Sequence, residues 1–130
     1  MMDKKKVLIV EDDDFLREIY IEILQEAGFD VDQAIDGDEA YQKITKGGWD
    51  LVLLDIILPK LDGLDIMKKI KAEGKGKLTK CLVFLTNLDN DEQIKQALEL
   101  GNGYLIKSQL TPDNLLKEVN VYIEKSESQG

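Results

Sequence analysis

The chain has 130 residues, enough for one ordinary domain that buries its own core. Hydrophobic residues make up 43% and charged residues 33%, a balance typical of soluble globular proteins. The net charge of −9 argues against binding to nucleic acid, because phosphates would repel so acidic a protein. We therefore expect no nucleic acid among its partners.

The single cysteine, Cys81, excludes an intrachain disulfide. It opens an apolar run, which predicts a buried, inert thiol rather than a reactive one. No apolar stretch approaches the ~20 residues that span a bilayer. The basic start of the chain leads into about four apolar residues, too few for a signal peptide. We expect a cytoplasmic protein without membrane contact.

Short apolar runs alternate with helical stretches along the first half of the chain. Near-continuous apolar runs predict strands over 7–10 and 51–54, and a short strand is expected over 30–35. A first helix is predicted over 14–27, ended by Gly28. It rests on six apolar residues at helical spacing: Phe15, Leu16, Ile19, Tyr20, Ile23 and Leu24. A second helix follows the capping segment 36–38 and ends at Lys46.

The alternation continues in the second half. A loop over 58–63 leads into a helix over 63–73, and strands are predicted over 82–85 and 104–106. The helix between these strands spans 91–100, with Ile94, Ala97 and Leu98 expected to face inward. Thr111 and Pro112 start the last helix, which has five apolar residues on one face: Leu115, Leu116, Val119, Tyr122 and Ile123.

Five strands alternating strictly with five helices predict an α/β fold. We expect a flavodoxin-like (βα)5 doubly wound parallel sheet of five strands in the order 2-1-3-4-5, with helices on both faces. The domain is expected over 5–124. The remaining residues, 125–130, are polar and are expected to form a frayed tail.

Polar side chains follow four of the predicted strands. Glu11 and Asp12 follow the first, Asp55 the third, Thr86 the fourth and Lys107 the fifth. The carboxyl ends of parallel strands form the edge where ligands bind. Carboxylates that converge there would repel one another unless one is protonated or a hard cation lies among them, and Mg²⁺ prefers oxygen ligands.

The polar residues at the strand ends have a chemical interpretation and a structural one. A carboxylate such as Asp55 can act as a nucleophile toward phosphorus, while Mg²⁺, the Lys107 ammonium and the Thr86 hydroxyl neutralise the phosphoryl oxygens. Acids at strand ends also serve as helix N-caps, a role that fits Asp13 or Asp14. The coincidence of four strand ends favours a site for a cation and a phosphoryl group.

The chain resembles the receiver domain of two-component response regulators, of the stand-alone, chemotaxis-regulator-like type. The resemblance rests on four motifs in order, at 7–13, 53–63, 84–87 and 103–107. It implies that Asp55 is the phosphoacceptor, that Thr86 and Lys107 contact the phosphoryl group, and that Thr86 and Tyr104 form the switch. The implied Mg²⁺ ligands are Glu11, Asp12, Asp55 and the backbone carbonyl of Ile57. Such a domain is not an enzyme beyond self-catalysed phosphotransfer and dephosphorylation.

The resemblance also implies partners. A sensor histidine kinase or a histidine phosphotransfer protein would supply the phosphoryl group, docking near the first helix. Phosphorylation would switch the face formed by the fourth helix, the fifth strand and the fifth helix. Because the sequence ends soon after the last helix, we expect the output to be a downstream protein target. The protein is expected to be a monomer that can dimerise when phosphorylated.

Three features depart from the family pattern. Ser108 follows the lysine where proline in a cis peptide is common, so a trans bond is expected. Asn87 stands where a small residue is usual and could crowd the site or add a hydrogen bond. The turn over 101–103 is one residue short, and its glycines are expected to absorb the strain. Two apolar positions beside the site, Ile57 and Leu88, are hypothesised to exclude water and prolong the phosphorylated state.

Two other functions remain open. A receiver-like module could signal without phosphorylation, and the three departures leave room for it, although Asp55, Thr86 and Lys107 argue against it. A Mg²⁺-dependent phosphohydrolase or nucleic-acid domain is the other reading. The phosphohydrolase pattern asks for a second acid two residues after the nucleophile, where this chain has Ile57.

Overall fold

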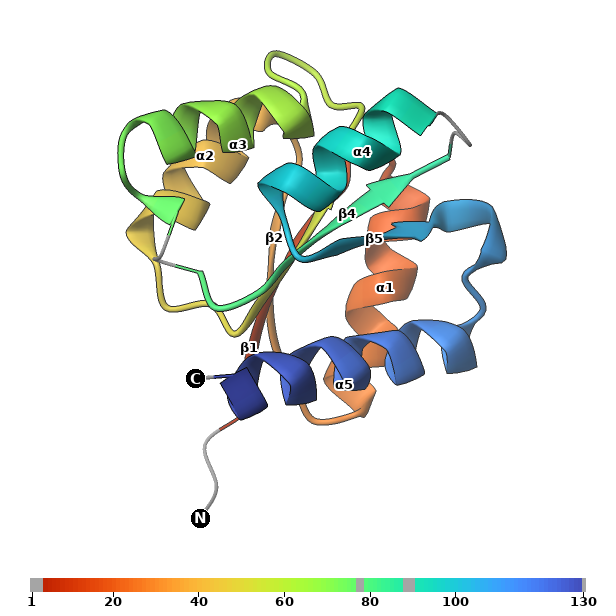
Figure 1. The fold of residues 1–130 in the computed structure, drawn as a ribbon. Helices are drawn as coiled ribbons and strands as arrows, with labels where there is room; N and C mark the ends of the chain where they lie inside the picture. The colour runs from red at the N-terminus through yellow and green to blue at the C-terminus, as the bar shows by residue number, and fades with distance from the viewer. Residues whose placement is uncertain (1–3, 77–78, 88–90, 130) are drawn as a thin grey trace.

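The protein folds around one sheet of five parallel strands, seen in a computed structural model that describes residues 4–76, 79–87 and 91–129 (Figure 1). The order β2-β1-β3-β4-β5 confirms the predicted topology. The strands are β1 (Lys6–Val10), β2 (Asp30–Ala34), β3 (Leu51–Asp55), β4 (Leu82–Thr86) and β5 (Gly103–Ile106). The helices are α1 (Asp14–Glu26), α2 (Gly37–Lys46), α3 (Gly63–Ala72), α4 (Asp91–Leu100) and α5 (Pro112–Gln129), with a 3₁₀ turn at Lys107–Gln109.

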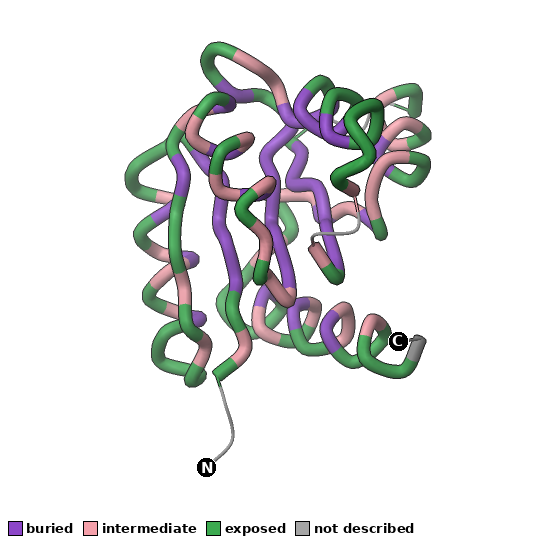
Figure 2. Tube along the Cα trace, turned by 90° about the vertical axis from the view of Figure 1, so that its left-hand side faces the viewer, coloured by how far each residue is buried: buried purple, intermediate pink, exposed green. Residues whose placement is uncertain are grey.

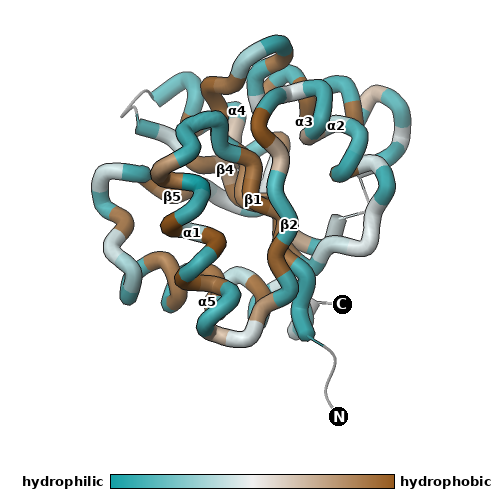
Figure 3. Tube along the Cα trace, turned by 180° about the vertical axis from the view of Figure 1, so that it is seen from behind, coloured by the Kyte–Doolittle hydropathy of each residue, from teal (hydrophilic) through white to brown (hydrophobic). Residues whose placement is uncertain are grey.

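Two apolar layers enclose the sheet because successive side chains of a strand point to opposite faces. Leu8 and Val10 join the layer under α2, α3 and α4, whereas Val7 and Ile9 join the layer under α1 and α5. Figure 2 shows the buried strands between the helices, and Figure 3 shows hydrophobic strands inside a largely hydrophilic exterior. Burial of both faces explains why β1, β3 and β4 are almost continuously apolar, unlike the edge strand β2.

The predicted helix boundaries follow from local caps. The side chain of Asp13 accepts from the backbone N–H of Leu16 at 3.0 Å and caps α1, which confirms its predicted structural role. Asp36 caps α2 in the same way, and Gly28 after α1 has a φ of 97°. The Thr111 hydroxyl accepts from Asn114 N at 3.1 Å, as expected for the N-cap of α5.

Two apolar residues that were expected to face the core do not. Phe15 is 72% exposed and Leu98 is 56% exposed. In α1 the buried positions are Arg17, Tyr20 and Leu24, a stripe that leaves Phe15 on the solvent side of the first turn. The sequence pattern did not separate these two stripes because apolar residues lie on both.

The expected frayed tail is wrong for residues 125–129, since α5 continues to Gln129. Ser126 Oγ donates to the carbonyl of Ile123 at 2.9 Å, and Lys5 pairs with Glu127. The last turns of α5 are therefore held by a side-chain hydrogen bond within the helix and by an ion pair to the residue before β1. Polar composition alone predicted fraying, but a polar helix end persists when the turns before it are packed on the sheet.

The short turn before β5 is held by packing rather than by strained backbone. Asn102 N donates to the carbonyl of Leu82 at 2.7 Å, and its side chain accepts from Leu82 N at 2.7 Å. Neither Gly101 nor Gly103 has a positive φ, so the expected absorption of strain by glycine is wrong. A Cβ on Gly103 would lie 2.2 Å from the Tyr122 hydroxyl oxygen, so lack of space requires glycine there.

Three further expectations concern the described residues. Cys81 is buried, as expected, and burial raises the pKa of its thiol to about 11, which disfavours the reactive thiolate. No peptide bond among the described residues is cis, as expected at Ser108. Within the same residues, no helix has the length and apolar character that crossing a membrane requires.

Candidate functional site

The sheet order brings the predicted site residues to one edge. β3 lies between β1 and β4, with Val10 opposite Leu54 and Asp55 opposite Leu85. Glu11 and Asp12 directly follow β1, and Asp55 is the last residue of β3. Thr86 ends β4 opposite Ile106, and Lys107 follows β5. The strand ends therefore converge as the sequence predicts.

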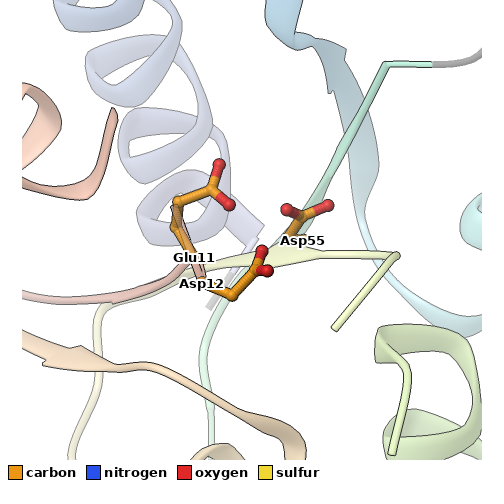
Figure 4. A group of neighbouring side chains, drawn as sticks. All are labelled: Glu11, Asp12 and Asp55. Atoms are coloured by element: carbon orange, nitrogen blue, oxygen red, sulfur yellow. The ribbon is translucent and has the colours of Figure 1, made fainter. Parts of the chain in front are cut away.

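Three carboxylates gather at this edge (Figure 4). Oxygens of Glu11, Asp12 and Asp55 lie within 4.8 Å of one another, a grouping that can hold a metal ion. Glu11 is fully buried and Asp55 is 4% exposed, whereas Asp12 is exposed. Two of the carboxylates are thus held inside the protein while the third opens to solvent.

Lys107 provides the positive charge of the site. Its Nζ lies 2.6 Å from Glu11 Oε1 and 2.8 Å from Asp55 Oδ2, and its side chain is 8% exposed. Burial opposes the charge of this ammonium, but the bonds to Asp55 and Glu11 outweigh burial and raise the pKa of Lys107. The lysine is therefore a fixed cation beside Asp55.

Burial and mutual proximity raise the pKa values of two carboxyl groups at this edge. Burial raises the pKa of Glu11, and Asp55 raises it further against the opposing effect of Lys107. Burial and the neighbouring Glu11 raise the pKa of Asp12 as well. Three acids facing one ammonium leave excess negative charge, which a divalent cation would offset.

The residues fit Mg²⁺. Glu11 Oε1 is buried, and its partner within the described residues is the Lys107 ammonium, 2.6 Å away. Such an oxygen, with Asp12 and Asp55 close by, supplies the hard ligands that Mg²⁺ takes together with water and phosphate. Ile57 N donates to Asp55 Oδ1 at 3.2 Å, which keeps the backbone of Ile57 beside the carboxylate.

A tight loop after β3 shapes the site. Gly63 N donates to the carbonyl of Ile56 at 2.7 Å, which turns the chain back from Asp55 into α3. A Cβ on Gly63 would lie 2.4 Å from the Asp55 carbonyl oxygen, so only glycine allows α3 to start this close to the phosphoacceptor position. Glycine at this position therefore shapes the loop between β3 and α3.

A cavity of about 260 Å³ opens above these groups. Its lining contains ten residues: Glu11, Asp12, Asp13, Leu16, Asp55, Ile56, Ile57, Thr86, Asn87 and Lys107. The volume is small for a drug-sized ligand but holds a cation with its waters and a phosphoryl group. A wider groove at the opposite end of the sheet is lined by Lys71, Lys80 and Tyr122 among others, and so lies far from the carboxylates.

The remaining predicted residues lie around this cavity. Thr86 is buried in its lining, and Tyr104 on β5 is half-buried against the apolar layer under α4. By strand alternation, Thr86 is expected to project to that same face. Asn87 lies exposed at the rim, whereas Leu88 falls outside the described residues.

Sequence reasoning missed Arg17, which is 8% exposed. Its guanidinium donates to the Glu11 carbonyl at 2.9 Å and to Gln33 Oε1 at 2.7 Å. A signal was present in the sequence, because position 17 lies three and seven residues before Tyr20 and Leu24. A charged residue on that stripe needs a buried partner.

Comparison with known proteins agrees with this geometry. Residues 7–120 match the response regulator receiver domain. The chain belongs to the response regulator receiver family. It resembles the solved CheY-like receiver domain protein from Methanospirillum hungatei JF-1, with a TM-score of 0.87, 26% identity, and coverage of 98% of this chain and 100% of that one. Chemotaxis response regulator CheY4 of Vibrio cholerae has a TM-score of 0.81, 29% identity, and coverage of 92% and 99%.

Curated relatives are transcriptional regulatory proteins. DltR of Streptococcus agalactiae is 34% identical over 121 residues, 93% of this chain and 53% of the relative. PhoP of Bacillus subtilis, an alkaline phosphatase synthesis regulator, is 32% identical over 95% of this chain and 50% of its own length. The receiver chain spans about half the length of these curated relatives.

Proposed function

We propose that this receiver accepts a phosphoryl group on Asp55 from the phosphohistidine of a sensor histidine kinase or a histidine phosphotransfer protein. The observation that carries the proposal is the convergence of three carboxylates within 4.8 Å, one of them held 2.8 Å from Lys107. Membership of the receiver family supports the same chemistry and the same class of donor.

The transfer follows from the positions of these groups. An Asp55 carboxylate oxygen attacks phosphorus, the new P–O bond forms, and the P–N bond to the donor imidazole breaks with its electron pair leaving on nitrogen. Lys107 and Thr86 line the cavity beside Asp55, and their ammonium and hydroxyl groups would interact with phosphoryl oxygens. Glu11, Asp12, Asp55 and the Ile57 carbonyl would hold Mg²⁺, which would supply positive charge to neutralise the phosphoryl group. The protein thus acts as a phosphoacceptor rather than as a turnover enzyme.

Phosphorylation would shift the population of two states of the face formed by α4, β5 and α5. Thr86 and Tyr104 lie on neighbouring strands, since Tyr104 is opposite Phe84, two residues before Thr86. Movement of the hydroxyl toward the phosphoryl group would free space for the Tyr104 ring. We therefore assign the coupling between site and surface to this pair.

The output is proposed to be a downstream protein bound by the switched face. The curated relatives act in transcription and are about twice as long, so the absence of nucleic-acid binding and the single-domain state stay predictions for this chain. The cytoplasmic location and a dimer formed on phosphorylation are likewise proposals.

The test is phosphorylation by acetyl phosphate, a small acyl phosphate, followed by intact mass. We expect a Mg²⁺-dependent gain of one phosphoryl group that Asp55→Asn abolishes, because an amide is no nucleophile toward phosphorus. Asp50→Asn, at an acid outside the cavity, serves as the matched control and should be phosphorylated normally. A folded wild-type protein that is never modified would favour the phosphorylation-independent module.

A further inference from the structure

The buried Arg17 connects the cation site to the rest of the fold. It lies in the first turns of α1, and its guanidinium contacts three different segments. Nη1 donates to the Glu11 carbonyl at 2.9 Å, Nε donates to Gln33 Oε1 at 2.7 Å, and Nη2 pairs with Asp14 Oδ1 at 2.5 Å. We propose that Arg17 is a positioning residue that orients the two consecutive acids of the Mg²⁺ site, a role that rests on the proposed function.

The Glu11 backbone is held at both of its polar groups. Its N–H donates to the carbonyl of Ala34 on β2 at 3.2 Å, and its carbonyl accepts from Arg17. This carbonyl belongs to the peptide plane that also contains the N–H of Asp12. Because that plane lies between the two side chains, its rotation changes the direction of both carboxylates.

Arg17 acts through the backbone rather than through its charge. Its partners are the Glu11 carbonyl, Gln33 and Asp14, and neither Gln33 nor Asp14 lines the cavity. The Glu11 carboxylate pairs instead with Lys107. Without the guanidinium, the buried Glu11 carbonyl would lose its partner or rotate to find another, and either change disturbs the ligand pair.

Gln33 fixes the other side of the guanidinium. Its own N–H donates to Asp32 Oδ1 at 2.7 Å, and its carbonyl accepts from Lys43 Nζ at 2.5 Å. The chain of contacts therefore runs from α2 through β2 and Arg17 to Glu11. The guanidinium joins Glu11 and Gln33 by donating from two different nitrogens, whereas a lysine ammonium carries its three donors on a single nitrogen.

The experiment measures the half-saturating Mg²⁺ concentration by amide NMR shifts at the site, together with the phosphorylation rate at saturating Mg²⁺. We expect Arg17→Met and Arg17→Lys to raise half-saturation about tenfold or more, as loss of outer-shell partners does at other metal sites. The rate should recover at saturating Mg²⁺, because the phosphoacceptor and Lys107 remain in place.

Two controls separate positioning from stability. Asp14→Asn removes only the negative charge of an exposed partner of Arg17. It should leave the half-saturating Mg²⁺ concentration unchanged. Leu24→Ala creates a cavity in the core beneath the same helix, so it should lower the unfolding temperature without changing Mg²⁺ binding. An equal rise in half-saturation for Leu24→Ala would overturn the proposal.

The outcomes for the two proposals differ. If the wild type binds Mg²⁺ and Arg17→Met has the same half-saturating Mg²⁺ concentration, the role of Arg17 is overturned and the proposed function is not. If Arg17→Met does not fold, Gln33→Met tests the same role, because Gln33 on the edge strand β2 holds the guanidinium. A half-saturating Mg²⁺ concentration of Gln33→Met equal to that of the wild type would overturn the role of Arg17. A wild type that binds no Mg²⁺ overturns the proposed function and the role of Arg17 together.

Discussion

Residues at the cation site are arranged for binding rather than for stability. Glu11 and Asp55 are buried beside Asp12, and Lys107 offsets only part of their charge. Burial raises the pKa values of Glu11 and Asp12, which means that the site disfavours the charged form of both carboxyl groups. Such a site lowers stability for the sake of function.

Neutralising one acid should therefore stabilise the metal-free protein. We expect Asp12→Asn to raise the free energy of unfolding in EDTA by up to about 1 kcal/mol, a small gain because the group is exposed and screened. Mg²⁺ should stabilise the wild type more than the variant. Urea unfolding with and without Mg²⁺ measures both effects, and Glu18→Gln, an exposed acid on α1, is the control. A less stable Asp12→Asn in EDTA would contradict the charge argument.

Ile57 should control the lifetime of the phosphorylated state. Its side chain is 60% exposed and lines the cavity, where an apolar group disfavours an attacking water. We expect Ile57→Asn to speed dephosphorylation about tenfold, equivalent to about 1.4 kcal/mol of barrier. Decay of the phosphorylated mass after removal of the donor gives the rate. Leu98→Asn, at an exposed apolar residue of α4, should keep the wild-type rate. Unchanged decay in both Ile57→Asn and Leu88→Glu would remove this hypothesis.

At the scale of elements, α5 supports β5 next to the switch residue. The phenol of Tyr122 occupies the space beside Gly103, where a side chain would otherwise lie. Burial raises the pKa of the Tyr122 hydroxyl, with the nearby Glu118 adding to the effect. The contact joins the middle of α5 to the residue that precedes Tyr104, so α5 and β5 pack closely against each other.

Gly103→Ala should destabilise the protein by about 1–3 kcal/mol, the usual cost of overpacking. Tyr122→Leu opens the space and should reduce the penalty of Gly103→Ala in the double variant. A double-mutant cycle by urea unfolding measures this coupling. Purely additive effects would show that the predicted clash between the new Cβ and the phenol is not what destabilises the variant.

Strands and helix limits were predictable because their signals are local. Runs such as 51–54 and 82–85 are apolar throughout, and Asp13, Gly28 and Thr111 mark helix ends by their own chemistry. The site followed from strand ends for the same reason. The buried face of α1, the length of α5 and the packing of Gly103 depend on contacts between distant segments. A single sequence gives only weak signals of such contacts. Arg17 is the clearest example, because two of its partners lie on other segments of the chain.

For the whole molecule, the strand order determines where the chemistry lies. Placing β1 beside β3 unites acids 43 positions apart in the sequence, from Asp12 to Asp55, at the carboxyl edge of the sheet. The same order places Thr86 on β4 beside β5, and Tyr104 on β5 packs in the apolar layer under α4. A charge change at Asp55 can therefore reach an outer face through two adjacent strands.

The most direct test is titration with beryllofluoride, which mimics an aspartyl phosphate, followed by backbone NMR with and without Mg²⁺. We predict saturable, Mg²⁺-dependent shifts at Thr86 and Tyr104 and along α4, all lost in Asp55→Asn. A folded wild-type protein whose spectrum is unchanged by beryllofluoride and Mg²⁺ would contradict the assignment of Asp55 as the phosphoacceptor of a working switch.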